Sequence, residues 1–472
     1  MKSQKFIGSG ADKKAIIFIA LATFFVLISI MLIRGGRLVG GLSYYYAGSA
    51  EDFLNGRYHG LAGIGWTSVF ALFGNVFGIE NTCRYLPLLF GVTGAVLYFV
   101  LASMLLGVFL SDEKNRFWLS FASALFFVLS PPFLRSFAVC DTVPIAFFLS
   151  LLAAILLFSR QYLYGFILTF ATLFFNIYFT VILFLMLLIL LIFNKKMSLV
   201  LPSFLKPSFV RVLLSLFFLG GGYILLSTLG AKTAGFRGLI FEFGGYGLRV
   251  FTIALSFFGF LILWKKKSEN AYIFAICIFL AFLSFYTFYA IIFLSAILPI
   301  IAALGLMWML DRKWESRFIK NFTIFALLFG IGLSGLSAIY SVADIEPSAG
   351  KFEGLNVLRA ISNNSEVVFS SQANGLLIEH VAKRTSVVNE FSNNDRLQDA
   401  NKLLYTRRLE GAMETINKYN ITYFFIDKEM ERALEEDEGL LFVLKYSKRF
   451  KKMYHNGEVG IWKLVVRPRT SK

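Results

Sequence analysis

Long apolar runs alternate with short polar segments along roughly the first 340 residues of the chain. Several runs exceed the ~18 residues that a helix needs to cross a hydrocarbon core of about 30 Å. The pattern therefore predicts a polytopic α-helical membrane protein with about eleven transmembrane helices. The expected spans are 14–34, 85–110, 116–133, 142–159, 161–177, 178–194, 209–229, 247–264, 271–286, 287–310 and 320–342.

Two of the apolar stretches are too long for a single crossing. Residues 161–194 would form a helix of about 50 Å at about 1.5 Å per residue. Arg160 lies at one end of this stretch, and Lys195 and Lys196 lie at the other. Because basic residues at both ends favour the cytoplasm, we expect a hairpin that turns near 176–178. The same argument divides 271–310 near 284–287.

Basic residues between the expected spans gather on one side of the membrane. With a cytoplasmic N-terminus, most loop lysines and arginines, including the triplet at 265–267, fall inside. Since loops rich in Lys and Arg remain cytoplasmic, this asymmetry fixes the orientation and places the segment from about 344 onward outside. We therefore expect a multi-pass cell-membrane protein with a transmembrane domain at 1–343 and an extracytoplasmic domain at 344–472.

The orientation also defines three outer loops, at 35–84, 134–141 and 230–246. The first is long and contains "LAGIGWTSVFALFGNVFG" at 61–78, which is amphipathic and rich in glycine. This segment is typical of an interfacial or re-entrant helix rather than a crossing.

The segment after about 351 is polar and alternates between strand and helix patterns. "SEVVFSS" (365–371), "RTSVVNE" (384–390) and "ITYFFID" (421–427) favour strands, with a Gly-centred loop between the first two. The nearly continuous apolar run at 421–427 is typical of a strand that is buried on both faces. Helical patterns precede and follow these strands, at 356–364, 399–420 and 428–436, and a late strand is expected at 457–465. The alternation predicts a small α/β domain.

Composition narrows the function classes. The chain is 57% hydrophobic, and its net charge is +17. The orientation rule accounts for much of that charge, so we expect no nucleic-acid partner. The three cysteines and three histidines have no metal-ligand or disulfide spacing.

Acidic residues on the outer side are the candidates for chemistry. Asp141, Glu242, Glu51 and Asp52 could supply hard oxygen ligands to a divalent ion such as Mn²⁺ or Mg²⁺, which would neutralise a phosphate leaving group. One acid could instead act as a general base without metal. Asp141 could equally cap the helix that follows it, and the other three could be solvated surface charges.

Three motifs together resemble membrane glycosyltransferases of the GT-C class, and most closely the catalytic subunit of archaeal oligosaccharyltransferase. "LSYYYAGSAEDFL" matches paired aromatics and an Ala-Glu helix after the first span, with Leu42 at the position of an expected Asp. "SALFFVLSPPFLRSFAVCDTV" keeps the first acid of an acidic pair, Asp141, and has Val143 in place of the second. "SSQANGLLIEHVAKRTSVV" resembles the family's signature segment, in which only Gly375 of the five signature positions 371–375 is retained.

The resemblance implies a transferase that takes a sugar or glycan from a polyprenyl- or dolichyl-phosphate (or pyrophosphate) donor. The acceptor would be a glycan, a lipid or a protein at the outer face. The resemblance implies acceptor contacts at Asn374 and Gly375, a metal held by Asp141 with Glu242, and catalytic acids at Asp141, Glu51 and Asp52. Arginines near the bilayer would bind the donor phosphate, and the candidates are Arg84, Arg135 and Arg237.

The departures from the family's motifs leave a second class of function open. The chain could be a catalytically inactive paralogue that binds glycolipid or acts as an accessory subunit in a membrane complex. A divergent peptide oligosaccharyltransferase and a lipid transporter are further alternatives, although the scarcity of charges inside the spans is unlike a polar translocation path.

Overall fold

The computed structural model describes residues 10–56, 64–110, 112–159, 161–193, 247–434 and 438–465. The chain divides into two compact units. We call the first the helical unit (Met1–Gly36, His59–Val69 and Arg84–Ala343) and the second the α/β unit (Arg37–Tyr58, Phe70–Cys83 and Asp344–Lys472). Parts of the first expected outer loop therefore belong to the α/β unit.

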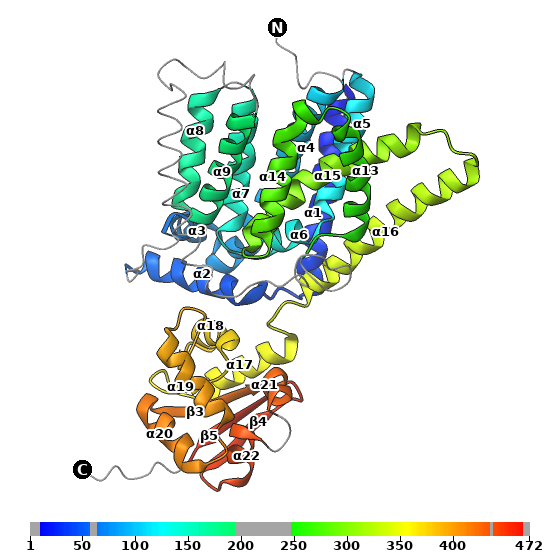
Figure 1. The fold of residues 1–472 in the computed structure, drawn as a ribbon. Coiled ribbons are helices and arrows are strands. Elements are labelled where there is room, and N and C mark those ends of the chain that lie inside the picture. Colours follow the sequence, from blue (N-terminus) through cyan, green and yellow to red (C-terminus); the bar gives the residue numbers. More distant parts are fainter. Residues whose placement is uncertain are drawn as a thin grey trace. The chain divides into compact units, whose positions relative to one another are not determined.

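The helical unit is a bundle built around one deeply buried helix (Figure 1). That helix is α15, which packs against both α5 and α13. The helices that lie wholly or mostly in this unit are α1 (Gly10–Ile33), α4 (Ile79–Phe109), α5 (Glu113–Val128), α6 (Pro131–Ala138), α7 (Val143–Phe158), α8 (Tyr162–Ala171), α9 (Ile177–Phe193), α13 (Val250–Trp264), α14 (Lys267–Ser284), α15 (Phe288–Asp311) and α16 (Arg317–Ala343). Helix α3 (Ile64–Phe77) and the start of α4 are divided between the two units.

Both hairpin turns that the sequence predicts are confirmed. A short 3₁₀ turn at Thr172–Phe174 and the buried Asn176 separate α8 from α9. The Asn176 side chain accepts hydrogen bonds from the backbone nitrogens of Tyr178 and Phe179 at 3.1 and 3.2 Å, so it caps the second helix. The other turn lies between the end of α14 at Ser284 and the start of α15 at Phe288.

The expected number of spans is not confirmed. Within the described ranges, four helices are long and apolar enough to cross a membrane, and α5 with α6 makes a fifth if that bent pair is one span. The pair bends by 61°. Pro131 and Pro132 are the first residues of α6, and proline cannot continue a preceding helix, which accounts for the break. The expected spans at 142–159 and 247–264 are helices of 16 and 15 residues. The span at 209–229 lies outside the described residues.

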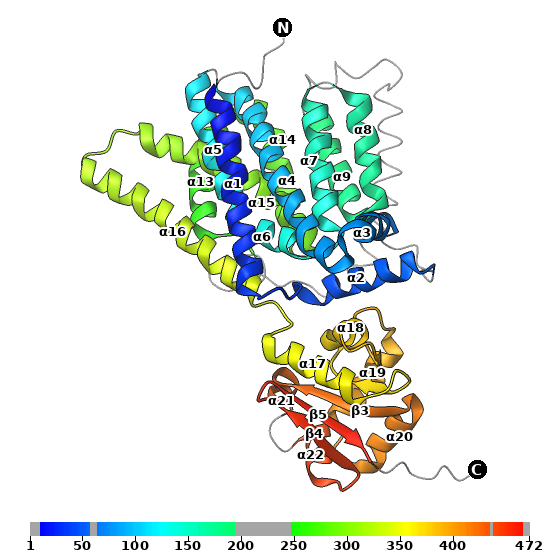
Figure 2. The same cartoon turned by 180° about the vertical axis from the view of Figure 1, so that it is seen from behind.

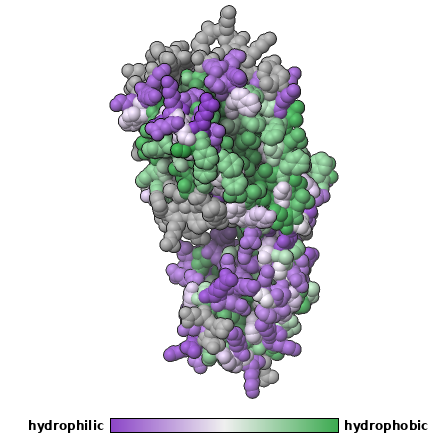
Figure 3. All heavy atoms as spheres, turned by 90° about the vertical axis from the view of Figure 1, so that its right-hand side faces the viewer, coloured by the Kyte–Doolittle hydropathy of each residue, from purple (hydrophilic) through white to green (hydrophobic). Residues whose placement is uncertain are grey.

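The lateral surface of the helical unit is apolar. Figure 3 shows hydrophobic side chains over much of its side, whereas the surface of the α/β unit seen there is mostly hydrophilic. Helix α16 exposes Phe318, Phe322, Phe325 and Tyr340 by more than half of each side chain's surface. Side chains of this kind in contact with water would be costly, so this surface suits a lipid environment.

Two glycines allow α13 and α15 to approach backbone to backbone. A Cβ atom at Gly259 would lie 1.9 Å from the Ile301 carbonyl oxygen, and one at Gly305 would lie 2.0 Å from the Leu255 carbonyl oxygen. Helices in membranes associate through such small residues because packing, rather than the hydrophobic effect, holds them together.

This contact gives the first prediction. Gly305→Val should destabilise the helical unit by about 1–3 kcal/mol or more, because the added atoms overpack a backbone contact. Thermal unfolding of the protein in nanodiscs, followed by tryptophan fluorescence, measures the effect. Gly332→Val in α16 is the matched control, since no atom lies within 4 Å of the added Cβ there. Equal midpoints for the two variants would contradict the prediction.

The α/β unit contains a mixed five-stranded sheet with strand order β2-β1-β3-β5-β4 (Figure 2). Strands β1 and β2 and strands β1 and β3 pair in parallel, whereas β5 is antiparallel to both β3 and β4. The strands are β1 (Val367–Phe369), β2 (Thr385–Ser386), β3 (Ile421–Asp427), β4 (Phe450–His455) and β5 (Val459–Leu464).

Helices cover both faces of the sheet, and side chains of β3 alternate between the two cores. Tyr423 and Phe425 pack with α17 (Ala349–Ile361) and α18 (Gln372–His380). Phe424 and Ile426 pack with the opposite set of helices. That set comprises α19 (Asn394–Tyr405), α20 (Leu409–Tyr419), α21 (Lys428–Ala433) and α22 (Gly439–Tyr446), and α2 (Gly40–Leu54) also belongs to this unit. Every residue of β3 is buried, as its continuous apolar pattern predicts.

The prediction of a Gly-centred loop after the first strand is wrong. Helix α18 begins at Gln372 and contains both Asn374 and Gly375. The glycine serves a close contact rather than a turn. A Cβ atom at Gly375 would lie 2.1 Å from the Val388 carbonyl oxygen, so only glycine lets α18 lie this close to the segment after β2. The single helical pattern at 399–420 falls partly in α19 and partly in α20, while α22 and β4 were not predicted.

Candidate functional site

Asp141 lies in the short connection between α6 and α7 of the helical unit. Its Oδ1 accepts a hydrogen bond from the backbone nitrogen of Val143 at 2.8 Å. The carboxylate therefore stabilises the first turn of α7, as one of the two sequence interpretations requires. Among the described residues this is its one hydrogen bond, so one carboxylate oxygen remains for other chemistry.

Four helix ends bring polar groups together around Asp141. Asn176, at the start of α9, donates from Nδ2 to the Thr142 hydroxyl at 3.0 Å. Tyr289, in the first turn of α15, interacts electrostatically with both Asp141 and Arg135. The Arg135 guanidinium lies 4.6 Å from the centre of the Phe288 ring. These groups form what we call the Asp141 cluster.

The Asp141 carboxyl has a pKa close to neutral pH. Asp141 is partly buried, and desolvation raises the pKa of its carboxyl to about 7, although the Val143 hydrogen bond and the Arg135 charge oppose the shift. A carboxyl of this pKa is poised to exchange a proton at neutral pH. Arg135 contributes a positive charge to the same cluster, which suits an anionic group such as a phosphate.

The other predicted phosphate ligands are placed differently. Arg84 lies on α4, and its guanidinium lies about 3.6 Å from where a Cβ atom at Gly36 would be, so it borders the turn after α1. Arg237 and Glu242 lie outside the described residues. The pairing of Asp141 with Glu242 therefore stays a prediction.

Glu51 and Asp52 belong to the α/β unit. Both are exposed on α2, and Glu51 forms an ion pair with Lys383 at 3.0 Å. Glu51 also lines a polar cavity with His380 and other residues of that unit.

Asn374 is fully buried in a polar network of the α/β unit. Its Nδ2 donates to Asp427 Oδ2 at 2.8 Å and to the Ser370 hydroxyl at 3.0 Å. Its Oδ1 accepts from Lys351 Nζ at 3.2 Å, and Lys351 also contacts Asp427 Oδ2 at 2.8 Å and the carboxylate of Glu346. The network joins the ends of β1 and β3 to α17 and α18, and its side chains satisfy one another.

Charge pairing keeps the buried ions of this network ionised. Burial alone would raise the pKa of Asp427, but Lys351 holds that pKa below its usual value. Burial likewise would lower the pKa of Lys351, and the Asp427 and Glu346 carboxylates raise it instead. Sequence reasoning missed Lys351 and Asp427 because a lysine in a helix and an aspartate at a strand end both look like ordinary surface residues.

The described acidic residues fit a divalent metal poorly. The one group of three acidic, His or Cys side chains that could share an ion, among the residues described, is Glu346, Asp427 and Glu429. The Lys351 ammonium already contacts two of these carboxylates, so a metal would have to displace a paired cation. Asp141 is not a member of this group.

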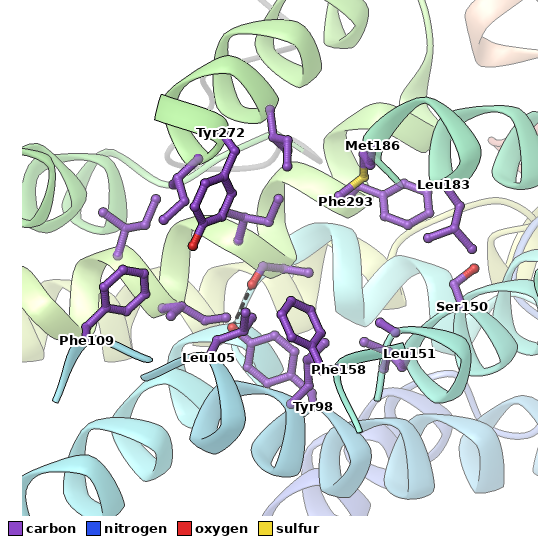
Figure 4. A pocket seen from close by; sticks show the side chains of 18 of the residues that line it. Tyr98, Leu105, Phe109, Ser150, Leu151, Phe158, Leu183, Met186, Tyr272 and Phe293 are labelled. Atoms are coloured by element: carbon purple, nitrogen blue, oxygen red, sulfur yellow. Dashed lines mark hydrogen bonds between the residues drawn. The ribbon is translucent and has the colours of Figure 1, made fainter. Parts of the chain in front are cut away.

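An apolar cavity of about 160 Å³ lies inside the helical unit (Figure 4). Its walls come from α4, α7, α9, α13, α14 and α15, and they are apolar apart from a few hydroxyl groups. One of these, Tyr98, donates to the Ala296 carbonyl at 2.7 Å. Figure 4 shows Phe109, Phe158, Leu183 and Phe293 around the space, which suits a hydrocarbon ligand.

No family model and no curated protein matches the sequence, but solved structures of membrane glycosyltransferases share its fold. The apo oligosaccharyltransferase of Archaeoglobus fulgidus is 14% identical with a TM-score of 0.64, over 88% of this chain and 70% of that one. The AglB oligosaccharyltransferase of the same organism, in complex with an inhibitory peptide and a dolichol-phosphate, is 14% identical with a TM-score of 0.59, over 90% and 70%. ArnT of Cupriavidus metallidurans, bound to undecaprenyl phosphate, is 11% identical with a TM-score of 0.51, over 95% and 97%. At these identities the likeness establishes the GT-C fold.

Proposed function

We propose that this protein is a membrane glycosyltransferase that transfers a sugar or glycan from a polyprenyl-phosphate or pyrophosphate donor to an acceptor outside the cytoplasm. The observation that carries the proposal is the Asp141 cluster, in which helix ends gather polar groups around a carboxyl of pKa about 7 and the Arg135 cation acts electrostatically on that carboxyl. The fold agrees with it, because the structures that share this fold include proteins bound to dolichol-phosphate and undecaprenyl phosphate.

Asp141 acts as the general base in this proposal. An acceptor hydroxyl attacks the anomeric carbon of the donor sugar, the bond from that carbon to the phosphate oxygen breaks, and the hydroxyl proton passes to Asp141. The lipid phosphate leaves with the electron pair of the broken bond. Arg135 stabilises the negative charge that grows on the phosphate, and Arg84 and Arg237 are further candidates for this contact.

The apolar cavity supports a lipid-linked donor. Its hydrocarbon lining suits an isoprenoid segment, for which burial away from polar groups is favourable. An oligosaccharyltransferase of this fold has been solved with zinc and sulfate, yet the described acids of this chain do not form an open metal site. The proposed transfer therefore needs no metal ion.

The acceptor is proposed to be a glycan or lipid hydroxyl rather than a peptide sequon. The family's signature positions 371–375 are mostly replaced here, and Asn374 is buried in the core of the α/β unit. In this proposal Asn374 and Gly375 are structural residues. Glu51 and Asp52, on α2, remain second candidates for the catalytic acid.

Turnover of lipid-linked sugars by the full chain in nanodiscs tests the proposal. Polyprenyl-phosphate mannose, glucose and N-acetylglucosamine are the donors, assayed with EDTA and with Mn²⁺ or Mg²⁺. Transfer or hydrolysis of any donor supports an enzyme, and its persistence in EDTA supports chemistry without a metal. Donor binding without turnover under every condition would overturn the proposal and favour the catalytically inactive, glycolipid-binding alternative.

A further inference from the structure

A cavity of about 600 Å³, open to solvent and lined by both polar and apolar groups, is formed by residues of the α/β unit. Its walls come from α2, from residues 74–80, and from α17 and α18 with the turn that follows. The volume falls inside the range of roughly 300–1,000 Å³ that small-molecule sites occupy. The sequence pattern does not predict this cavity, because it joins α2 and residues 74–80 to α17 and α18, which are distant along the chain.

The charged groups that line the cavity balance one another. The lining contains two carboxylates, Glu51 and Glu80, and two cations, Arg359 and Lys383, and Lys383 pairs with Glu51 at 3.0 Å. The imidazole of His380 adds no charge at neutral pH, since burial and the Lys383 charge lower its pKa to about 4. A cavity without net charge discriminates against polyanions and polycations.

The lining combines hydrogen-bonding groups with aromatic faces. The amides of Asn75 and Asn356 can both donate hydrogen bonds to hydroxyl groups and accept them. The Arg359 guanidinium can donate to hydroxyl oxygens. Tyr44 and Phe352 lie with their ring centres 6.3 Å apart and give the wall two aromatic rings. This is the chemistry of a neutral polyhydroxylated ligand, which presents both hydroxyls and apolar C–H faces.

One wall of the cavity is held rigidly. A Cβ atom at Gly48 would lie 2.1 Å from His380 Nδ1, so glycine lets α2 lie directly against α18. The Tyr45 ring adds an edge-to-face contact with His380 at 5.6 Å. A preformed wall reduces the entropy lost when a ligand binds.

We propose that this cavity binds a neutral oligosaccharide, as a subsite for the glycan chain of a donor or acceptor. The inference deepens the proposed function and rests on it for the source of that glycan. It separates glycan recognition by the α/β unit from the Asp141 cluster of the helical unit.

Binding of uncharged trisaccharides to the full chain in nanodiscs tests the proposal. The probes are chitotriose, mannotriose and maltotriose, measured by saturation-transfer NMR, with a hexuronate trisaccharide and a neutral nine-residue peptide as competitors. Asn356→Ala combined with Arg359→Ala removes two exposed groups from α17, and the matched control is Asn401→Ala with Lys402→Ala on the exposed side of α19. We expect at least one neutral trisaccharide to bind, and the α17 pair to weaken it about tenfold or more while the control pair leaves it unchanged.

Three results would overturn the inference. They are equal binding by the α17 variant and the control, preference for the hexuronate or the peptide, and no binding of any neutral trisaccharide below about 10 mM. Turnover of lipid-linked sugars by the wild-type chain separates this inference from the proposed function. Trisaccharide binding by a wild-type chain that turns over no donor would leave the subsite standing and refute the transferase proposal. Asp141→Ala should keep the trisaccharide binding and lose only turnover.

Discussion

Replacing Asp141 by asparagine should lower turnover of a lipid-linked sugar by about 10²–10⁴-fold, the usual contribution of a general base. Asparagine keeps an Oδ1 that can accept the hydrogen bond from Val143, so the start of α7 stays capped. Asp141→Ala should lose the same activity and, in addition, about 0.5–2 kcal/mol of stability through the lost cap. The comparison of the two variants thus separates the chemical role of the carboxyl from its structural role.

Steady-state kinetics and thermal unfolding of both variants in nanodiscs measure this. Asp311→Asn, at the end of α15, is the control, because it removes an exposed carboxylate of the same unit. An Asp141→Asn enzyme with wild-type turnover would show that the carboxyl is only a helix cap.

The dependence of turnover on pH gives an independent check. A base must be deprotonated, so turnover should be low below the pKa of Asp141, at about 7, and should rise as the pH passes through that value. Arg135 lowers the pKa, so Arg135→Ala should move the rise to higher pH as well as weaken donor binding. A pH profile without a rise near neutrality, or one that Arg135→Ala leaves in place, would contradict the assignment.

Charge and hydrophobic length were sufficient to predict the turns of the helical unit. The stretch 161–194 had to divide because basic residues bound both of its ends, and Asn176 caps the second helix at that point. The buried strand β3 followed from its unbroken apolar run. Both predictions rest on local sequence, where the physical cause and the observed element lie together.

Tertiary contacts explain what the sequence could not show. Gly375 resembles a loop residue, but it is a helical residue that meets the Val388 carbonyl. Asn374 and Asp427 are 53 positions apart and form one network only after β1 and β3 pair. Asp141 was a candidate because it is an acidic residue on the outer side and matches a family motif, whereas Asn176 and Tyr289, which complete the cluster, come from two other hairpins.

Replacing Lys351 by methionine should destabilise the α/β unit by about 3–5 kcal/mol, because removal of one partner leaves a buried ion uncompensated. Lys351 and Asp427 are exposed by only 4% and 3% of their side-chain surface. Without Lys351, the Asp427 carboxylate would keep its bonds to Asn374 and Met430 but lose its positive partner. Lys402→Met, which breaks an exposed pair with Glu414, should cost less than about 1 kcal/mol.

Hydrogen exchange of β3 amides in the full chain, in nanodiscs, reports this destabilisation. The loss of stability in Lys351→Met should diminish as the pH falls, because protonation of Asp427 removes the charge that Lys351 neutralised. The wild type should depend on pH in the opposite direction. Lys351 lowers the pKa of Asp427, so the stability that this ion pair contributes is present at neutral pH and is lost as the pH falls through that pKa. Combining Lys351→Met with Asp427→Asn removes the charge and keeps the acceptor for Met430, so it should restore part of the protection. If the double variant were no more protected than Lys351→Met, the cost would come from packing around the lysine chain and not from a buried charge.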